Sequence, residues 1–168
     1  MFTVKRNPNP EPETPMPTIT FTAGCGGSGK STVLRRMYPE LEGVDPDVIK
    51  TTIAGYDPLH PERTHKASSE AATREFYRRL SEGNDFYLDG TGRNVEKYVG
   101  LISAAKAAGY RTRILYVHAS LETCLTRNAR RSRKVPVEVI HEAFISVKTS
   151  MGILRHYVDS FVDVENED

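Results

Sequence analysis

The chain has 168 residues, 38% of them hydrophobic and 27% charged, which suits one domain large enough to bury a core. Lys and Arg number 23 against 22 Asp and Glu, and this net charge of +1 argues against the strongly basic surface of a nucleic-acid coat, although it permits a local basic groove. No apolar run approaches the roughly 20 residues of a membrane span, and no signal-peptide pattern opens the sequence.

Two cysteines make no disulfide framework, so we expect Cys25 and Cys124 to be reduced thiols in a cytoplasmic protein without a membrane partner. Residues 1–17 hold five of the ten prolines and few apolar side chains. Such a segment cannot bury enough surface to offset its ordering entropy. We therefore expect a flexible Pro-rich tail over residues 1–17 and one domain over residues 18–168.

A phosphate-binding loop follows the first predicted strand. Residues 18–23 are β-branched, aromatic or small, and residues 24–31 match G-x-x-x-x-G-K-[ST] before a predicted helix. Small residues let backbone N–H groups close around phosphate oxygens, and the new helix adds its positive dipole end. We expect a nucleoside triphosphate here, with Lys30 at the outer phosphates and Ser31 on Mg²⁺. The predicted nucleotide-binding residues of this segment are Gly24, Cys25, Gly26, Gly27, Ser28, Gly29, Lys30, Ser31 and Thr32.

Acidic residues follow the next predicted strand, over residues 41–44. Asp47 is our candidate for the carboxylate that orients or deprotonates an acceptor hydroxyl, and Lys50 lies three residues later on the same helical face. The alternative is that Asp47 only caps the helix that starts there. Asp45, which precedes a proline, is the better candidate for that cap or for a turn.

A helix over about residues 66–81 and a loop at Gly83 lead to the third strand, residues 86–89, which ends in Asp89. An acid in this place can hold Mg²⁺ as a Walker B acid does. Because the loop of residues 90–94 extends directly from it, Asp89 can instead contact the acceptor, or it can simply cap a turn.

The rest of the sequence predicts three helices and two strands. The helices run from Asn94 to residue 108, from Ser120 onwards, and from Pro136 to about residue 152, and the strands cover residues 113–117 and 161–164. Strands that alternate with helices predict an α/β fold with three layers, a five-stranded parallel sheet covered by helices on both faces. Ligands of such sheets bind at the carboxyl ends of the strands, where the phosphate loop and the acids all fall.

Five cations lie within eight residues near the end of the penultimate helical region: Arg127, Arg130, Arg131, Arg133 and Lys134. Three of them share one helical face, where mutual repulsion is unfavourable without an anion. A solvated basic helix is the ordinary interpretation of such a run. Beside a predicted triphosphate, a lid over its phosphates is the better one.

Four segments resemble P-loop kinases. The phosphate loop, residues 47–50 and residues 88–93 are similar to those of zeta-toxin-type kinases, which use ATP to phosphorylate a UDP-amino-sugar hydroxyl. Residues 125–136 are more similar to the lid of polynucleotide 5′-hydroxyl kinases, and viral kinases of hydroxymethyl groups on DNA bases are similar in outline. The resemblance spans residues 18 to about 155 and implies a P-loop NTPase fold that uses ATP and Mg²⁺.

The resemblance assigns roles to residues at matching positions. It implies that Asp47 is the acid that activates the acceptor and that Lys50 occupies a nearby basic position. Arg131 matches the lid arginine on the transferring phosphate, and Arg127 is a second candidate for contact with the nucleotide. The acceptor-side positions of zeta toxins fall on Asp89, Thr91 and Arg93, although that strand-end acid is usually Glu.

The sequence thus predicts an ATP-dependent kinase that phosphorylates a hydroxyl of a nucleic acid or nucleotide. One alternative is a zeta-toxin-like sugar kinase, which implies an antitoxin-like protein partner. The other is a nucleotide-dependent switch without an acceptor, and Asp47 and the basic lid argue against it because a switch needs no acceptor-activating carboxylate.

Overall fold

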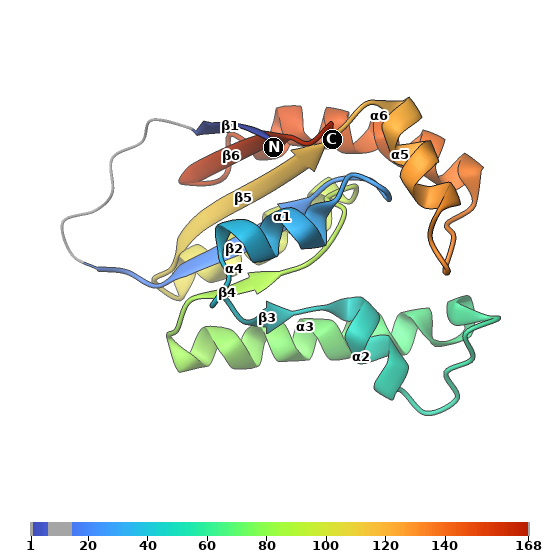
Figure 1. Cartoon of the computed structure of the whole chain (residues 1–168). Helices are drawn as coiled ribbons and strands as arrows, with labels where there is room; N and C mark the ends of the chain where they lie inside the picture. The colour runs from blue at the N-terminus through green and yellow to red at the C-terminus, as the bar shows by residue number, and fades with distance from the viewer. Residues whose placement is uncertain (1, 7–14, 168) are drawn as a thin grey trace.

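The computed structural model describes residues 2–6 and 15–167 of the chain. A six-stranded sheet with the strand order β1-β6-β5-β2-β4-β3 runs through its centre (Figure 1). All neighbouring strands are parallel except β1, which pairs with β6 in the antiparallel direction. The strands are β1 (Thr3–Arg6), β2 (Thr18–Ala23), β3 (Gly43–Val44), β4 (Phe86–Leu88), β5 (Arg111–His118) and β6 (Ser160–Glu165).

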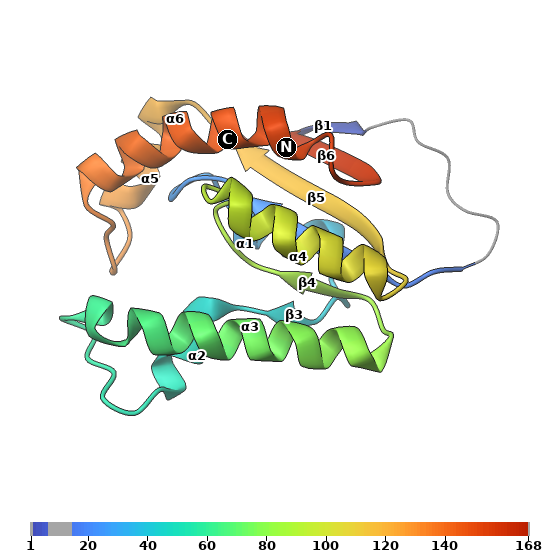
Figure 2. The same cartoon turned by 180° about the vertical axis from the view of Figure 1, so that it is seen from behind.

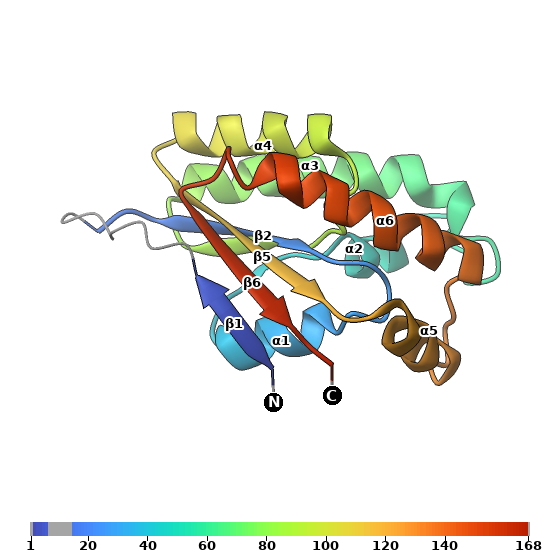
Figure 3. The same cartoon turned by 90° about the horizontal axis from the view of Figure 1, so that it is seen from above.

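Helices cover both faces of the sheet, as expected for parallel strands joined by crossovers. One face packs on α1, and the other packs on α3, α4 and α6 (Figures 2 and 3). The short helix α2 follows β3, and α5 follows β5. The helices are α1 (Lys30–Met37), α2 (Pro46–Thr52), the 3₁₀ helix η1 (Pro61–Thr64), α3 (His65–Glu82), α4 (Val95–Ala107), α5 (Leu121–Ala129) and α6 (Val137–Leu154).

The prediction of a five-stranded, all-parallel sheet was wrong by one strand. The sixth strand, Thr3–Arg6, comes from the segment for which the prolines predicted a flexible tail. Phe2 and Val4 pack against the cluster that contains Val162 and Val164, and Val4 pairs with Val164 across the sheet edge. This apolar alternation is too short to stand out beside so many prolines. The remainder of the predicted tail, residues 7–14, lies outside the described residues.

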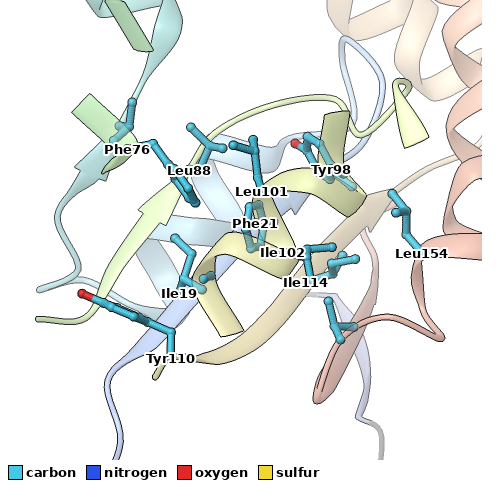
Figure 4. Packing of buried hydrophobic residues seen from close by; sticks show 14 of the residues in the cluster. Ile19, Phe21, Phe76, Leu88, Tyr98, Leu101, Ile102, Tyr110, Ile114 and Leu154 are labelled. Carbon is cyan, nitrogen blue, oxygen red and sulfur yellow. The ribbon is translucent and has the colours of Figure 1, made fainter. Parts of the chain in front are cut away.

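The main core lies between the sheet and α3, α4 and α6 (Figure 4). Phe21 of β2 has no exposed surface, and its ring centroid lies 6.0 Å from that of Phe76 and 5.6 Å from that of Tyr98. The buried Tyr98 hydroxyl donates a 2.8 Å hydrogen bond to the carbonyl oxygen of Thr22. Burial raises the pKa of Tyr98, so the phenol keeps its proton and stays a donor. The core thereby fixes the end of β2, from which the phosphate loop begins.

We expect Tyr98→Phe to lower the free energy of unfolding by about 1–2 kcal/mol, because the buried Thr22 carbonyl loses its hydroxyl partner. Urea unfolding followed by circular dichroism measures this change. Tyr157, whose side chain is 43% exposed, provides the matched control, and Tyr157→Phe should stay within about 0.5 kcal/mol of the unmodified protein. Equal stability of the two variants would show that the hydrogen bond contributes nothing.

Candidate active site

The phosphate loop connects β2 to α1 in a conformation suited to an anion. Gly29, the residue before α1, has φ 87° in the left-handed region, and Gly27 has φ 85°. Lys30 donates from Nζ to the carbonyl oxygen of Gly24 at 2.9 Å, so its ammonium group lies over the loop. The Ser28 hydroxyl is buried without a hydrogen-bond partner in the described structure, which is costly unless a ligand supplies one. These features fit a bound phosphate chain.

Side chains hold the loop by its carbonyl groups. Arg127 of α5 donates from Nη1 to the carbonyl oxygens of Gly27 and Ser28, both at 3.2 Å. Asn166, just after β6, donates from Nδ2 to the Ser28 carbonyl at 2.9 Å, and Arg127 Nη2 donates to the Asn166 carbonyl at 2.8 Å. These hydrogen bonds hold the Gly27 and Ser28 carbonyls away from the cleft side of the loop and fix the conformation of its backbone.

Packing against α5 also requires glycine at one loop position. A Cβ atom on Gly27 would lie 2.3 Å from the carbonyl oxygen of Cys124, closer than real contacts allow. The loop backbone therefore touches the α5 backbone directly. Any side chain at this position would push the loop away from α5 and disturb the support from Arg127.

Asp89 lies at the carboxyl end of β4, beside the end of β2. Its Oδ1 atom accepts a 2.6 Å hydrogen bond from the Thr22 hydroxyl, which in turn accepts a 2.9 Å bond from the N–H group of Gly90. The neighbouring backbone adds a bond from the Gly24 N–H group to the Thr91 carbonyl at 3.0 Å. The acid and the phosphate loop are therefore fixed relative to each other.

Asp45 and Asp47 have different roles at the start of α2. The carboxylate of Asp45 accepts hydrogen bonds from the N–H groups of Asp47 and Val48, so Asp45 is the helix cap that its place before proline indicated. Burial, with repulsion from Asp89 as the next cause, raises the pKa of Asp45. Asp47 is exposed in the first turn of the helix and lies in the wall of a cleft.

This cleft has a volume of about 270 Å³ and is lined by predicted site residues from distant parts of the chain. Its polar wall combines the phosphate loop with Asp47 from α2, three residues after β4, and Arg131. Apolar side chains of the segment after α5 and of α6 close the other side. The lining residues are Cys25, Gly26, Gly27, Ser28, Gly29, Lys30, Ser31, Thr32, Asp47, Asp89, Thr91, Arg93, Arg131, Val135, Val139, Ile140 and Ala143.

A second pocket of about 180 Å³ adjoins the cleft and shares Asp89, Thr91 and Arg93 with it. Its remaining lining is mainly apolar, with one exposed lysine, Lys97. Arg93 donates to the hydroxyl of Ser146 at 3.1 Å, which ties this wall to α6. The other lining residues are Pro46, Ala72, Thr73, Phe76, Leu88, Gly90, Gly92, Asn94, Tyr98 and Leu101.

Two of the cations for which the sequence predicts a lid, Arg127 and Arg131, lie in different places. Arg131 lines the cleft, whereas Arg127 supports the loop and is not among the described residues that line the cleft. The buried Asn128 holds the basic segment in place, since its side chain donates to the Val135 carbonyl at 2.8 Å and accepts from the Val135 N–H group at 2.9 Å. Lys50, in the last turn of α2, is also absent from that lining.

Sequence reasoning missed several residues that build the site. Thr22, Asn128 and Asn166 position the acid, the basic segment and the loop through hydrogen bonds between distant segments. Lys97 and the aromatic floor of the second pocket were also missed. Thr22 is one of three alternating threonines in Thr18–Ala23, and only its place at the end of the strand, just before the loop, set it apart in the sequence.

The comparisons with known proteins agree with this fold. Residues 19–152 match the model of the AAA domain family, so the chain belongs to that family. The fold, with its phosphate-loop cleft, is that of P-loop kinases. A search of curated proteins finds no match. No described helix is long and apolar enough to cross a membrane.

Solved structures of low identity share the fold. The AvrRxo1-ORF1:-ORF2 complex with ATP has a TM-score of 0.67 and 19% identity, covering 84% of this chain and 50% of that chain. The PezAT toxin–antitoxin system of Streptococcus pneumoniae has a TM-score of 0.62 and 16% identity, covering 87% and 65%. The Pnkp1/Rnl/Hen1 RNA repair complex has a TM-score of 0.64 and 15% identity, covering 82% and 46%. This chain therefore spans about half of the first and third matched chains.

We expect Lys30→Ala to remove most of the affinity for Mg-ATP, because the ammonium group over the loop neutralises the outer phosphates. Isothermal titration calorimetry measures the affinity, and thermal unfolding without ligand checks that the fold is retained. Lys106→Ala is the control, since Lys106 is exposed near the end of α4. Unchanged affinity in the Lys30 variant would contradict the assignment of the loop.

Proposed function

We propose that this chain is an ATP-dependent kinase that transfers the γ-phosphoryl group to a hydroxyl of a nucleic acid or nucleotide. The observation that carries the proposal is that the phosphate-loop cleft and the second pocket meet at Asp89, Thr91 and Arg93. A phosphate donor in the cleft and an acceptor in the pocket would then have their reacting atoms side by side. In this arrangement positioning supplies much of the rate enhancement of phosphoryl transfer.

Each residue has a task in this proposal. The loop N–H groups and Lys30 bind the β- and γ-phosphates, and Arg131 stabilises the charge on the group in transfer. Asp47 orients the acceptor hydroxyl and accepts its proton. Ser31 and Asp89 would hold Mg²⁺, an ion that takes few protein ligands beside phosphate oxygens and water, and the ion would neutralise charge that develops on the phosphates.

The second pocket favours an acceptor with a ring and nearby phosphates. Its floor is formed by buried apolar side chains, among them Leu88, Tyr98 and Leu101, and its volume of about 180 Å³ suits a single ring system. Arg93 and Lys97 are exposed at the same pocket and can contact phosphates of a nucleotide chain. Either a polynucleotide end or a hydroxyl on a modified DNA base fits this description.

A panel of acceptors tests the proposal directly. The protein is incubated with γ-labelled ATP and, separately, with a 5′-hydroxyl oligonucleotide, DNA containing hydroxymethylated bases, a mononucleotide and a UDP-amino-sugar. Label on a nucleic acid or nucleotide supports the proposal. Label on the sugar alone supports the zeta-toxin-like alternative and an antitoxin-like partner, and ADP release without any labelled acceptor supports the switch.

Arg131→Ala should lower turnover by roughly 10³-fold or more, the scale of catalytic arginines in phosphoryl transfer, while ATP binding weakens much less. Turnover with the best acceptor of the panel measures the effect. Arg130→Ala is the matched control, because Arg130 is the exposed neighbour that does not belong to the lining of the cleft. Equal losses in both variants would assign the basic segment only a general electrostatic effect.

Asp47→Asn should lower transfer by about 10²–10⁴-fold, because a positioned base contributes on this scale. ATP affinity and thermal stability should be unchanged, since Asp45 rather than Asp47 caps α2. Asp57→Asn, the same chemical change in the loop after α2, serves as control. If transfer survives in the Asp47 variant while stability is normal, the base is another group, and Asp89 is the next candidate.

A further inference from the structure

The two cysteines of the chain lie side by side although 99 positions separate them. Cys25 belongs to the phosphate loop and Cys124 to α5, and their sulfur atoms are 3.5 Å apart. Both are free thiols, with 6% and 0% of their surface exposed. A disulfide has sulfur atoms about 2.05 Å apart, so a shift of roughly 1.5 Å would join them.

The two thiols differ in acidity. The hydrogen bond between the two sulfur atoms lowers the pKa of Cys25 to about 7. Burial acts against this effect, and the Lys30 ammonium group adds to it. The same hydrogen bond, together with burial, raises the pKa of Cys124. Cys25 is therefore the nucleophile of the pair and Cys124 the proton-bearing partner.

A small oxidant can approach Cys25 from two sides. Cys25 lines the phosphate-binding cleft, and it also lines a separate cavity of about 240 Å³ with Tyr116, His118 and Lys148. Thiolates react with peroxides when they are accessible to them, whereas buried thiols without a path stay inert.

Oxidation of this pair would act on the loop that binds phosphate. Cys25 accepts a hydrogen bond at its carbonyl from the Ser28 N–H group at 3.1 Å. Gly27 already touches the Cys124 carbonyl, so the loop cannot move closer to α5 as a rigid body. We expect the part of the sulfur shift that the two side chains do not absorb to rotate the loop backbone, which moves its N–H groups out of the geometry that an anion needs.

We propose that Cys25 and Cys124 form a peroxide-sensitive dithiol whose oxidation to a disulfide disables nucleotide binding. The Cys25 thiolate attacks one oxygen of hydrogen peroxide and the O–O bond breaks. Cys25 becomes a sulfenic acid, and the other oxygen departs as hydroxide, which takes up a proton to give water. The Cys124 sulfur then attacks the Cys25 sulfur, the S–O bond breaks, and water leaves. In sum, two thiols and one peroxide give one disulfide and two waters. A dithiol reductant such as dithiothreitol then returns the disulfide to two thiols and is itself oxidised to a disulfide.

The test uses the full chain, reduced and then treated with hydrogen peroxide. Peptide mapping without reductant should find a Cys25–Cys124 cross-link, and intact mass should show the loss of two hydrogens. Affinity for Mg-ATP should fall by roughly tenfold or more, a change of about 1.4 kcal/mol or more, and dithiothreitol should restore it. Mg-ATP added before the peroxide should slow the oxidation, because it fills the cleft that Cys25 lines.

Variants separate the cross-link from other oxidation. Cys124→Ser and Cys124→Ala keep the loop cysteine, should bind Mg-ATP normally when reduced, and should give only a sulfenic acid that dimedone traps. Their affinity should recover poorly after longer exposure, because no disulfide protects Cys25 from further oxidation. Two different substitutions of Cys124 are used so that the test remains possible if one of the variants fails to fold.

Three outcomes would overturn the inference: thiols consumed without a cross-link in the unmodified protein, a cross-linked protein with unchanged affinity, or loss of affinity that is the same in the Cys124 variants and reversible. The inference goes beyond the proposed kinase activity, because every readout is nucleotide binding or thiol chemistry. If the reduced protein does not bind Mg-ATP, that result contradicts the proposed function. The formation of the Cys25–Cys124 cross-link then still tests whether the two cysteines are a peroxide-sensitive pair.

Discussion

The site depends on how the carbonyl groups of the phosphate loop are bound. Arg127 and Asn166 donate hydrogen bonds to the carbonyls of Gly27 and Ser28. These bonds fix the backbone conformation of the loop before any ligand arrives. A cation beside the loop also favours a bound anion. One arginine therefore supports both the shape and the charge of the loop.

The proposed acceptor side is fixed by the parallel pairing of β2 with β4. This pairing brings Thr22 beside Asp89, and their 2.6 Å hydrogen bond joins the strand that precedes the phosphate loop to the strand that carries the acid. Tyr98 holds the same end of β2 from the core. The distance between the proposed donor and acceptor pockets is thus set by a rigid sheet, and precise positioning is what phosphoryl transfer requires.

The helix α5 couples three features that the sequence separates. It carries Arg127 against the loop, Cys124 against Cys25, and Asn128 at the base of the basic segment that places Arg131 in the cleft. Any movement of α5 therefore changes loop support and the position of Arg131 together. This arrangement explains why a covalent bond between the two sulfurs would affect nucleotide binding rather than only stability.

The sequence by itself determined the alternation of strands and helices, the phosphate loop and the strand-end acids, because periodicity, glycine spacing and lysine at a fixed offset are local signals. Only the tertiary structure decided that Thr3–Arg6 adds a sixth strand, that Arg127 supports the loop while Arg131 lines the cleft, and that Cys25 meets Cys124. These features depend on contacts between segments far apart in the chain. Residue spacing along the sequence carries no information about which side chains such contacts bring together.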